Sequence, residues 1–207
     1  YTEERFIAQI HPVPDAAIAP DDPDGCQPHF ANMTTTFFNK VDPGTSTYEW
    51  NFGDGGTDAS QNPSYSFSQV GVNDVTLKIT TIHGCDTTLT MPITVHPIPV
   101  ANFTPNPNNS TTAALPKFQF NNESSISSGS IISNLWEFGQ VVNDTSSLTS
   151  PTHIYLPDTG TYYVTLKVES EFGCRDSITK PVIIGPDILV FIPNAFSPDG
   201  GGPNQND

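Results

Sequence analysis

Basic residues are scarce in this sequence, in which 7 Lys and Arg stand against 22 Asp and Glu, for a formal net charge of −15. Because proteins bind nucleic-acid phosphates through clustered Lys and Arg, this balance excludes nucleic acid as a partner. Long apolar runs are missing too, since none approaches the roughly 18 residues that a membrane-spanning helix needs. We therefore expect neither a nucleic-acid-binding protein nor a membrane-spanning one.

Charged residues of both signs make up only 14% of the chain, whereas Pro (20) and Gly (15) are frequent. This composition is typical of turn-rich extracellular β-modules rather than of cytosolic enzymes. Hydrophobic residues reach 35%, which is low for one large core but enough for two small ones. A length of 207 residues agrees with one or two domains.

One stretch organises the chain and returns once in altered form. In residues 48–56, Trp50 and Phe52 are two positions apart, and Trp136 and Phe138 repeat that spacing. Residues two apart on a strand point to the same face, so each pair should form the aromatic centre of a core. The repeat predicts two small β-domains in tandem.

A glycine-rich segment, Gly53-Asp54-Gly55, follows the first aromatic pair. Glycine takes positive φ without a steric penalty, so a tight turn is expected here, with Asp54 bonding nearby backbone amides. A catalytic acid would need a second carboxylate or a histidine held nearby, and Gln140 replaces Asp54 in the second copy. We interpret Asp54 as a turn residue and expect no catalytic residue.

Landmark residues recur with a period of about 85 to 90 residues. The pairs are His11 and His96, Trp50 and Trp136, and Cys85 and Cys174. Both histidines begin a His-Pro-apolar-Pro link, so they are expected to pack between domains, and the prolines should make successive domains a semi-rigid rod. We expect the sequence to begin within a longer chain, with these parts: the last strand of a preceding repeat (1–12), domain 1 (13–97), domain 2 (98–186) and a tail (187–207).

Alternating apolar and polar residues predict half-buried antiparallel strands in both repeats. Residues 72–81 follow this pattern in the first copy, as do residues 164–168 in the second. Residues 29–38, which are rich in Thr, and residues 47–52, which contain Trp50, are also predicted to be strands. About seven short strands per unit, frequent turn signals and no helical period predict an all-β protein of tandem immunoglobulin-like sandwiches.

The first copy resembles the PKD (polycystic kidney disease) domain family. Its motifs, in order, are Trp-x-Phe-Gly-Asp-Gly, Asn-Pro-x-Tyr-x-Phe and Gly-x-x-x-Val-Thr-Leu-x-Ile. The resemblance implies an immunoglobulin-like sandwich of the kind found in extracellular arrays. In the second copy Gln140 stands in place of Asp54 and the turn is two residues longer, which argues against a tight turn there.

Residues 189–207 resemble the opening of the gliding-motility-associated type B C-terminal domain, with the phrase Pro-Asn-Ala-Phe-Ser-Pro-Asp-Gly. That family is a sorting signal of type IX secretion in Bacteroidota. The resemblance implies export to the cell surface and attachment to the outer membrane through a β-barrel protein of the secretion or gliding machinery.

The sequence contains three cysteines, so at most two of them can form a disulfide within the chain. Cys26 and Cys85 lie near the start and end of the first repeat, each directly after a glycine, where two strand ends could meet. We predict a Cys26–Cys85 disulfide, which would close a loop of about 60 residues and stabilise the fold by roughly 4 kcal/mol. Cys174 is equivalent to Cys85, and we expect it to be a lone thiol.

Acidic residues are clustered in two parts of the sequence, and each cluster is a candidate Ca²⁺-binding site. Asp21, Asp22 and Asp24 lie near the start of domain 1, and Asp199 and Asp207 lie in the tail. Carboxylates are ligands that Ca²⁺ takes, although neither stretch has the spacing of an EF-hand loop. The alternative is a solvated acidic surface. No other cofactor or metal site is expected.

Two short motifs resemble the Asp-Thr/Ser signal for O-glycosylation in Bacteroidota. They are Asp86-Thr87-Thr88 and Asp176-Ser177-Ile178, which follow the two Gly-Cys pairs at positions that look equivalent. Thr87 and Ser177 are therefore candidate glycan sites. The alternative is a polar start to the last strand of each repeat.

Together these features favour a non-enzymatic cell-surface stalk or adhesin segment, exported by type IX secretion and held at the outer membrane through its C-terminal domain. Resemblance to the ends of gliding adhesins supports an adhesin as parent. Two alternatives remain. One is a spacer or carbohydrate-binding module of a secreted hydrolase, with surface polysaccharide as partner, and an exposed aromatic platform would favour it. The other is homophilic or Ca²⁺-dependent contact.

Overall fold

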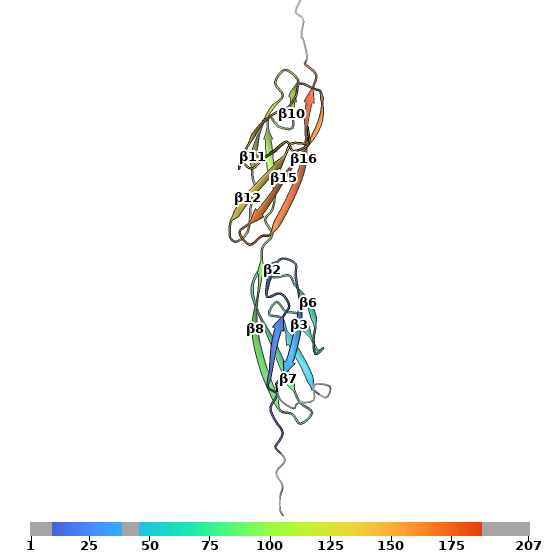
Figure 1. The fold of residues 1–207 in the computed structure, drawn as a ribbon, viewed down its shortest axis with the longest axis vertical. Coiled ribbons are helices and arrows are strands. Elements are labelled where there is room, and N and C mark those ends of the chain that lie inside the picture. The colour runs from blue at the N-terminus through green and yellow to red at the C-terminus, as the bar shows by residue number, and fades with distance from the viewer. Residues whose placement is uncertain (1–9, 39–45, 188–207) are drawn as a thin grey trace, which may run out of the picture.

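The computed structural model describes residues 10–38 and 46–187, and every regular element within them is a strand. The strands form two units placed end to end, one within residues 16–96 and the other within residues 103–185 (Figure 1). We call these units domain 1 and domain 2. In the described part of the chain, no helix is long and apolar enough to cross a membrane.

Domain 1 is a sandwich of a three-stranded and a five-stranded sheet. Its strands are β1 (Ala16–Pro20), β2 (Asp24–Cys26), β3 (His29–Phe37), β4 (Thr47–Asn51), β5 (Thr57–Asp58), β6 (Ser64–Phe67), β7 (Gly71–Thr80) and β8 (Asp86–His96). The strand orders are β1-β3-β6 and β2-β8-β7-β4-β5. All neighbours are antiparallel except β2, which runs parallel to β8.

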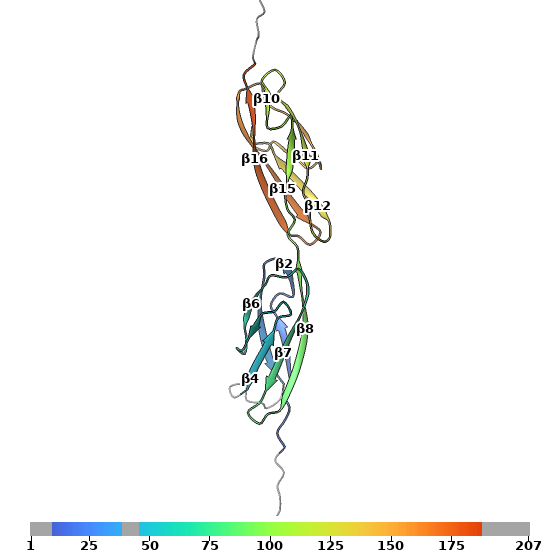
Figure 2. The same ribbon diagram turned by 180° about the vertical axis from the view of Figure 1, so that it is seen from behind.

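Domain 2 repeats this topology strand for strand. Its strands are β9 (Phe103–Asn106), β10 (Ser110–Thr112), β11 (Lys117–Asn122), β12 (Ile131–Glu137), β13 (Thr145–Ser146), β14 (Thr152–Ile154), β15 (Gly160–Ser170) and β16 (Arg175–Gly185). The sheets have the orders β14-β11-β9 and β10-β16-β15-β12-β13, and β10 is the parallel strand. Figure 2 shows the same two-unit arrangement from behind.

Period-two patterning explains the longest strands. In β7, Val75, Leu77 and Ile79 are fully buried, while the residues between them are partly exposed. β7 pairs with β8 over ten residue pairs, and β15 pairs with β16 in the same way. These two hairpins run the length of each domain and therefore connect its two poles.

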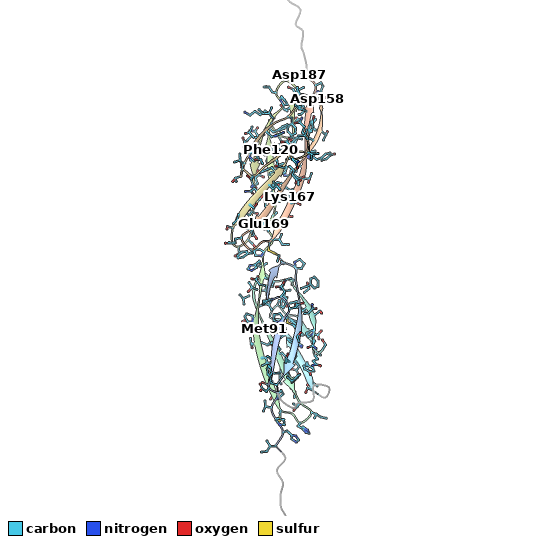
Figure 3. The ribbon with its side chains drawn as sticks, viewed as in Figure 1. Met91, Phe120, Asp158, Lys167, Glu169 and Asp187 are labelled. Carbon is cyan, nitrogen blue, oxygen red and sulfur yellow. A yellow bond between two sulfur atoms is a disulfide. The ribbon has the colours of Figure 1, made fainter. Side chains whose placement is uncertain are left out.

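Each domain has its own aromatic core, as the sequence predicted. The predicted core residues are buried: Trp50 (2% exposed), Phe52 (0%), Trp136 (0%) and Phe138 (2%). Both indole N–H groups donate hydrogen bonds of 2.9 Å to backbone carbonyls, of Ser60 in domain 1 and Leu148 in domain 2. Side chains fill the space between the sheets, with Phe120 in the middle of domain 2 (Figure 3). The two cores are separate clusters, so each domain carries the burial that stabilises it.

The all-β fold of tandem immunoglobulin-like sandwiches is therefore confirmed. The tail that resembles a sorting domain, with Asp199 and Asp207, lies outside the described residues, as does most of the strand predicted before residue 12.

Candidate functional site: the joint between the domains

Parallel pairing of β2 with β8 places Cys26 at the end of domain 1 that faces domain 2. Asp24 pairs with Thr94, and Cys26 pairs with His96, the last residue of β8. The backbone N–H of Gln27 continues the pairing with a 2.9 Å hydrogen bond to the carbonyl of His96. Cys26 is therefore fixed beside the point where the chain leaves domain 1.

The β15–β16 turn of domain 2 reaches the same place from the other side. Ser170 N–H donates to the carbonyl of Cys174, and Cys174 N–H donates to the Ser170 hydroxyl at 3.2 Å. Gly173 has a φ of +78°, which lets the chain reverse within this short turn. Cys174 thus projects toward domain 1 from a rigid hairpin end.

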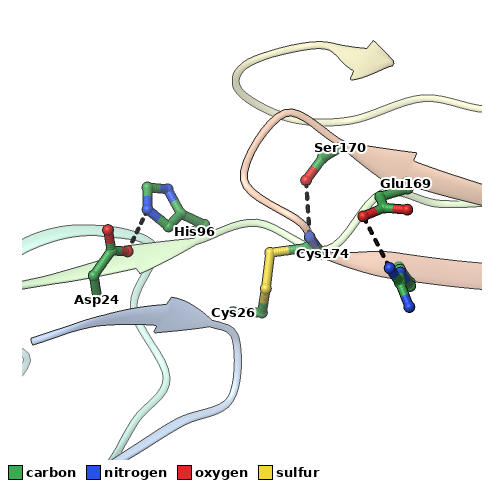
Figure 4. The surroundings of a disulfide bond; sticks show 7 residues. Asp24, Cys26, His96, Glu169, Ser170 and Cys174 are labelled. Carbon is green, nitrogen blue, oxygen red and sulfur yellow. Dashed lines mark hydrogen bonds and ion pairs between the residues drawn. A yellow bond between two sulfur atoms is a disulfide. The ribbon is translucent and has the colours of Figure 1, made fainter. Parts of the chain in front are cut away.

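Cys26 and Cys174 form a disulfide across the joint, with a Cα–Cα distance of 5.7 Å and a sequence separation of 148 residues (Figure 4). The bond is shielded from solvent on the domain 2 side, where Cys174 is 1% exposed. The domains are therefore connected twice, by the main chain after His96 and by this bond.

The predicted Cys26–Cys85 disulfide is wrong. Cys26 lies beside His96 at one end of β8, whereas Cys85 immediately precedes Asp86 at the other end. β8 is eleven residues long, so its two ends are ten steps of about 3.3 Å apart, roughly 33 Å. A disulfide needs Cα atoms within about 7 Å. Cys174, predicted to be the lone thiol, is bonded, and Cys85 is free instead.

His96 packs between the domains, as predicted for this link histidine. Its ring stacks on Phe172 of domain 2 with centroids 4.0 Å apart. Its Nε2 lies 2.5 Å from Asp24 Oδ1, as Figure 4 shows. Sequence reasoning missed the part played by Phe172. The available signal was its position two residues before Cys174, which His83 shares relative to Cys85.

The first predicted turn has the expected geometry. Gly53 and Gly55 have φ values of +84° and +99°, and Gly56 N–H donates to Asp54 Oδ1 at 3.3 Å. The Tyr65 hydroxyl donates to the same oxygen at 2.8 Å. Burial, together with this bond to a carboxylate, raises the pKa of Tyr65. Asp54 is held as a turn residue, as the sequence indicated.

The corresponding turn of domain 2 is wider, also as predicted. Phe52 N–H bonds the carbonyl of Gly56 four residues on, whereas Phe138 N–H bonds that of Asp144, six residues on. Asp144 then faces His153, whose Nε2 lies 3.2 Å from Asp144 Oδ2. His153 stacks on Phe138 at 4.1 Å, and burial lowers its pKa although Asp144 opposes the shift.

The candidate calcium ligands of domain 1 point to separate partners. The backbone and side-chain N–H groups of Asn32 bond Asp21 at 2.8 and 2.6 Å and hold its pKa below the ordinary value. Asp22 accepts a long hydrogen bond from the backbone of Asp24, whose own carboxylate is paired with His96. In residues 10–38 and 46–187, no three His, Cys, Asp or Glu side chains form a group able to hold a metal ion.

The two candidate glycosylation motifs are not equivalent in the structure, which corrects the prediction. Counting from the matching turns, Thr80 pairs with Asp86 in domain 1 and Glu169 pairs with Arg175 in domain 2. Thr87 is therefore one residue out of register with Ser177, and a shift of one residue places side chains on opposite faces of a strand. Ser177 is exposed and Thr87 is half-buried.

Comparison with known proteins agrees with this architecture. The family model described as PKD domain matches residues 11–95 and again 96–184. Among solved structures, the chain is similar to the PKD1 domain of the Vibrio cholerae metalloprotease PrtV (32% identity over 42% of this chain and 98% of that one, TM-score 0.36). It is also similar to the PKD1 domain of Vibrio anguillarum Epp (27% identity over 44% and 96%, TM-score 0.38). The chain belongs to the PKD domain family and contains two such domains in tandem.

Proposed function

We propose that this chain is a non-enzymatic spacer of a cell-surface protein, which holds neighbouring parts of that protein apart as a stiff rod. The observation that carries this proposal is the Cys26–Cys174 bond at the narrow joint between two elongated domains. A single peptide link leaves two domains free to bend and twist about it. A second covalent connection beside the link removes most of that freedom.

Other features of the joint support the same role. Pro97 and Pro99 restrict the backbone of the link, and the stack of His96 on Phe172 fills the contact beside it. PKD domains are generally non-catalytic extracellular modules, and disulfides persist in oxidising compartments outside the cytosol. A rod that projects from a cell would work in such a compartment.

We also propose how the protein reaches the cell surface, from the resemblance of its C-terminal tail. Residues 189–207 resemble a type B sorting domain, so we propose export by type IX secretion and attachment to an outer-membrane β-barrel protein, with a gliding adhesin as parent. The test is a pull-down from outer membranes of a type IX-secreting bacterium. The chain extended through a complete C-terminal domain should retain a β-barrel protein, and the two sandwiches alone should not. Retention by the sandwiches alone, or by neither form, would contradict this anchoring.

Small-angle X-ray scattering tests the rod itself. The oxidised chain should give one narrow distribution of interatomic distances with a maximum set by two domains end to end. Cys174→Ser should broaden that distribution toward shorter distances, because only the peptide link then holds the joint. Cys85→Ser is the matched control and should change nothing. Equal scattering from the oxidised chain and Cys174→Ser would contradict the role of the disulfide.

The arrangement of aromatic side chains does not favour the alternative of a carbohydrate-binding module. In the described residues the exposed Phe, Tyr and Trp side chains are Phe30, Phe38, Tyr163 and Phe172. Phe30 and Phe38 are eight residues apart along β3 and its end, which is about 26 Å in extended chain. Tyr163 belongs to the other domain, and Phe172 is stacked on His96. These rings do not form one platform.

A further inference from the structure

The β7–β8 turn of domain 1 reproduces the turn that carries the bonded Cys174. Thr81 N–H bonds the carbonyl of Cys85 at 2.9 Å, Gly84 N–H bonds that of Thr81 at 2.9 Å, and Cys85 N–H bonds the Thr81 hydroxyl at 3.2 Å. The Ser170–Cys174 turn has the same three hydrogen bonds at the same lengths. Gly84 has a φ of +76° and Gly173 one of +78°. Cys85 therefore projects from the end of domain 1 in the same orientation as Cys174 projects from the end of domain 2.

The ring stack beside the disulfide also has a counterpart at this pole. His11 and His83 stack with centroids 3.4 Å apart and an interplanar angle of 17°. They hold the positions of His96 and Phe172, whose angle is 10°. Cys85 Sγ lies 3.7 Å from the carbonyl of His11 and keeps an exposed side. The link histidine, the stacked ring and the cysteine are thus assembled as they are at the bonded joint.

We propose that Cys85 is the receiving half of a second interdomain disulfide, and that the N-terminal pole of domain 1 binds the cysteine-bearing pole of another PKD domain. At the bonded joint the cysteine of domain 1 comes from the end of an Asp-Gly-Cys strand. Cys26 lies beside His96 there, and Asp24 is paired with the His96 ring. The partner domain would place an equivalent strand end parallel to Ile10 and His11. The Ile10 side chain is 89% exposed.

The residues at the C-terminal pole of a PKD domain decide whether that domain can be the partner. In domain 2, Thr112 pairs with Gly185 where Cys26 pairs with His96 in domain 1. The C-terminal pole of domain 2 therefore lacks both the thiol and the imidazole. A domain of the domain 1 type carries both, so it is the occupant that fits. This inference rests on the geometry of the turn and the stack, independently of the stalk role.

The bond forms by thiol–disulfide exchange with a disulfide-bearing oxidant, the class of reagent that forms disulfides outside the cytosol. The incoming cysteine first forms a mixed disulfide with the oxidant and displaces one of its thiols. The Cys85 thiolate then attacks the sulfur of the incoming cysteine and displaces the second thiol. Two S–H bonds are lost, one S–S bond forms, and the oxidant is reduced to two thiols.

The test places a second copy of domain 1, residues 10–95, directly before His11 of the intact remainder of the chain. This junction reproduces Val95-His96-Pro97 as Val95-His11-Pro12, and the added copy brings its own aromatic core. The added copy carries Cys85→Ser, to remove a competing thiol, and Phe30→Tyr at an exposed position as a mass label. Folding takes place in a glutathione buffer poised so that Cys26–Cys174 forms in the unmodified chain.

Mass spectrometry of peptides from the non-reduced protein identifies which cysteines are bonded to each other. The proposal predicts a bond between the labelled Cys26 peptide and the Cys85 peptide, alongside the Cys26–Cys174 bond of the original joint, which serves as an internal reference. A control with Cys26→Ser and Gln27→Cys in the added copy moves the thiol by one residue, and that copy should then stay unbonded. The proposal is overturned when the reference bond forms and the labelled Cys26 remains open to alkylation, or when the control bonds equally well.

Discussion

His96 and Phe172 stack face to face across the joint, with ring centroids 4.0 Å apart and ring planes 10° from parallel. His96 ends the last strand of domain 1, and Phe172 lies in the turn of domain 2 that carries Cys174. The stack and the disulfide therefore restrain one joint together. Their contributions should be coupled, because either contact keeps the other in place.

Removing both restraints should free the joint more than removing either one. Phe172→Ala alone should leave the domains tumbling together because the disulfide remains, and Phe172→Ala with Cys174→Ser should let them tumble independently. NMR ¹⁵N relaxation measures this as the rotational correlation time of each domain. Phe38→Ala, at the opposite end of β3 from the joint, is the control. Independent tumbling of the domains in the unmodified oxidised chain would refute the account.

The turn of domain 1 should depend on its carboxylate. Asp54→Ala removes the acceptor of both the Tyr65 hydroxyl and Gly56 N–H, and we expect a loss of about 1–2 kcal/mol in the free energy of unfolding of domain 1. Gln140→Ala, at the corresponding position of the wider turn, should change the stability of domain 2 by under about 0.5 kcal/mol. Urea unfolding followed by Trp fluorescence measures both. Equal effects of the two substitutions would show that the carboxylate is not what holds the first turn.

Acid should destabilise domain 2 through His153. Burial holds the pKa of this histidine below 6.5, so the folded domain favours the neutral ring. That stabilisation is fully present above about pH 6.5 and declines as the pH falls toward the lowered pKa of the folded state. We expect the melting temperature of domain 2 to fall over this range, and to fall less in His153→Tyr, which installs the residue that domain 1 has at this position. Thermal melts between pH 7.5 and 4.5 measure the difference. The same slope in both proteins would exclude His153 as the cause.

Two glycines with similar backbone angles should tolerate alanine differently. Gly139 (φ +76°) and Gly173 (φ +78°) would both incur the cost of a left-handed alanine, about 1 kcal/mol. A Cβ at Gly139 would also lie 2.4 Å from the carbonyl oxygen of Tyr163, whereas one at Gly173 meets nothing within 4 Å. Gly139→Ala should therefore lose at least about 2 kcal/mol more than Gly173→Ala in the stability of domain 2. Equal losses in denaturant titrations would contradict this reading of the turn.

Local patterns in the sequence were enough to predict the all-β sandwich fold of each domain. The alternation in β7 and the spacing of Trp50 and Phe52 fix which faces are buried, since a strand offers only two. The two extra residues after Phe138 were enough to predict the wider second turn. These features depend on neighbours along the chain, so they can be read without the tertiary structure.

The joint could not be read in that way, because its residues come from separate parts of the chain. Pairing Cys26 with Cys85 followed from their closeness to a repeat boundary, but β8 runs the full length of the domain and holds them at opposite poles. The relative register of Thr87 and Ser177 could not be read from the sequence for a related reason. Their motifs match at the aspartates, whereas the hairpin turns align the strands on Cys85 and Cys174.

The measurement that tests the central claim most directly is a thiol and disulfide map of the folded, oxidised chain. Alkylation before reduction, followed by peptide mass spectrometry, identifies the free cysteine and the bonded pair. The account predicts a Cys26–Cys174 link with Cys85 as the alkylated thiol. A Cys26–Cys85 link with Cys174 alkylated would place the bond within domain 1 and remove the covalent joint on which the rod depends.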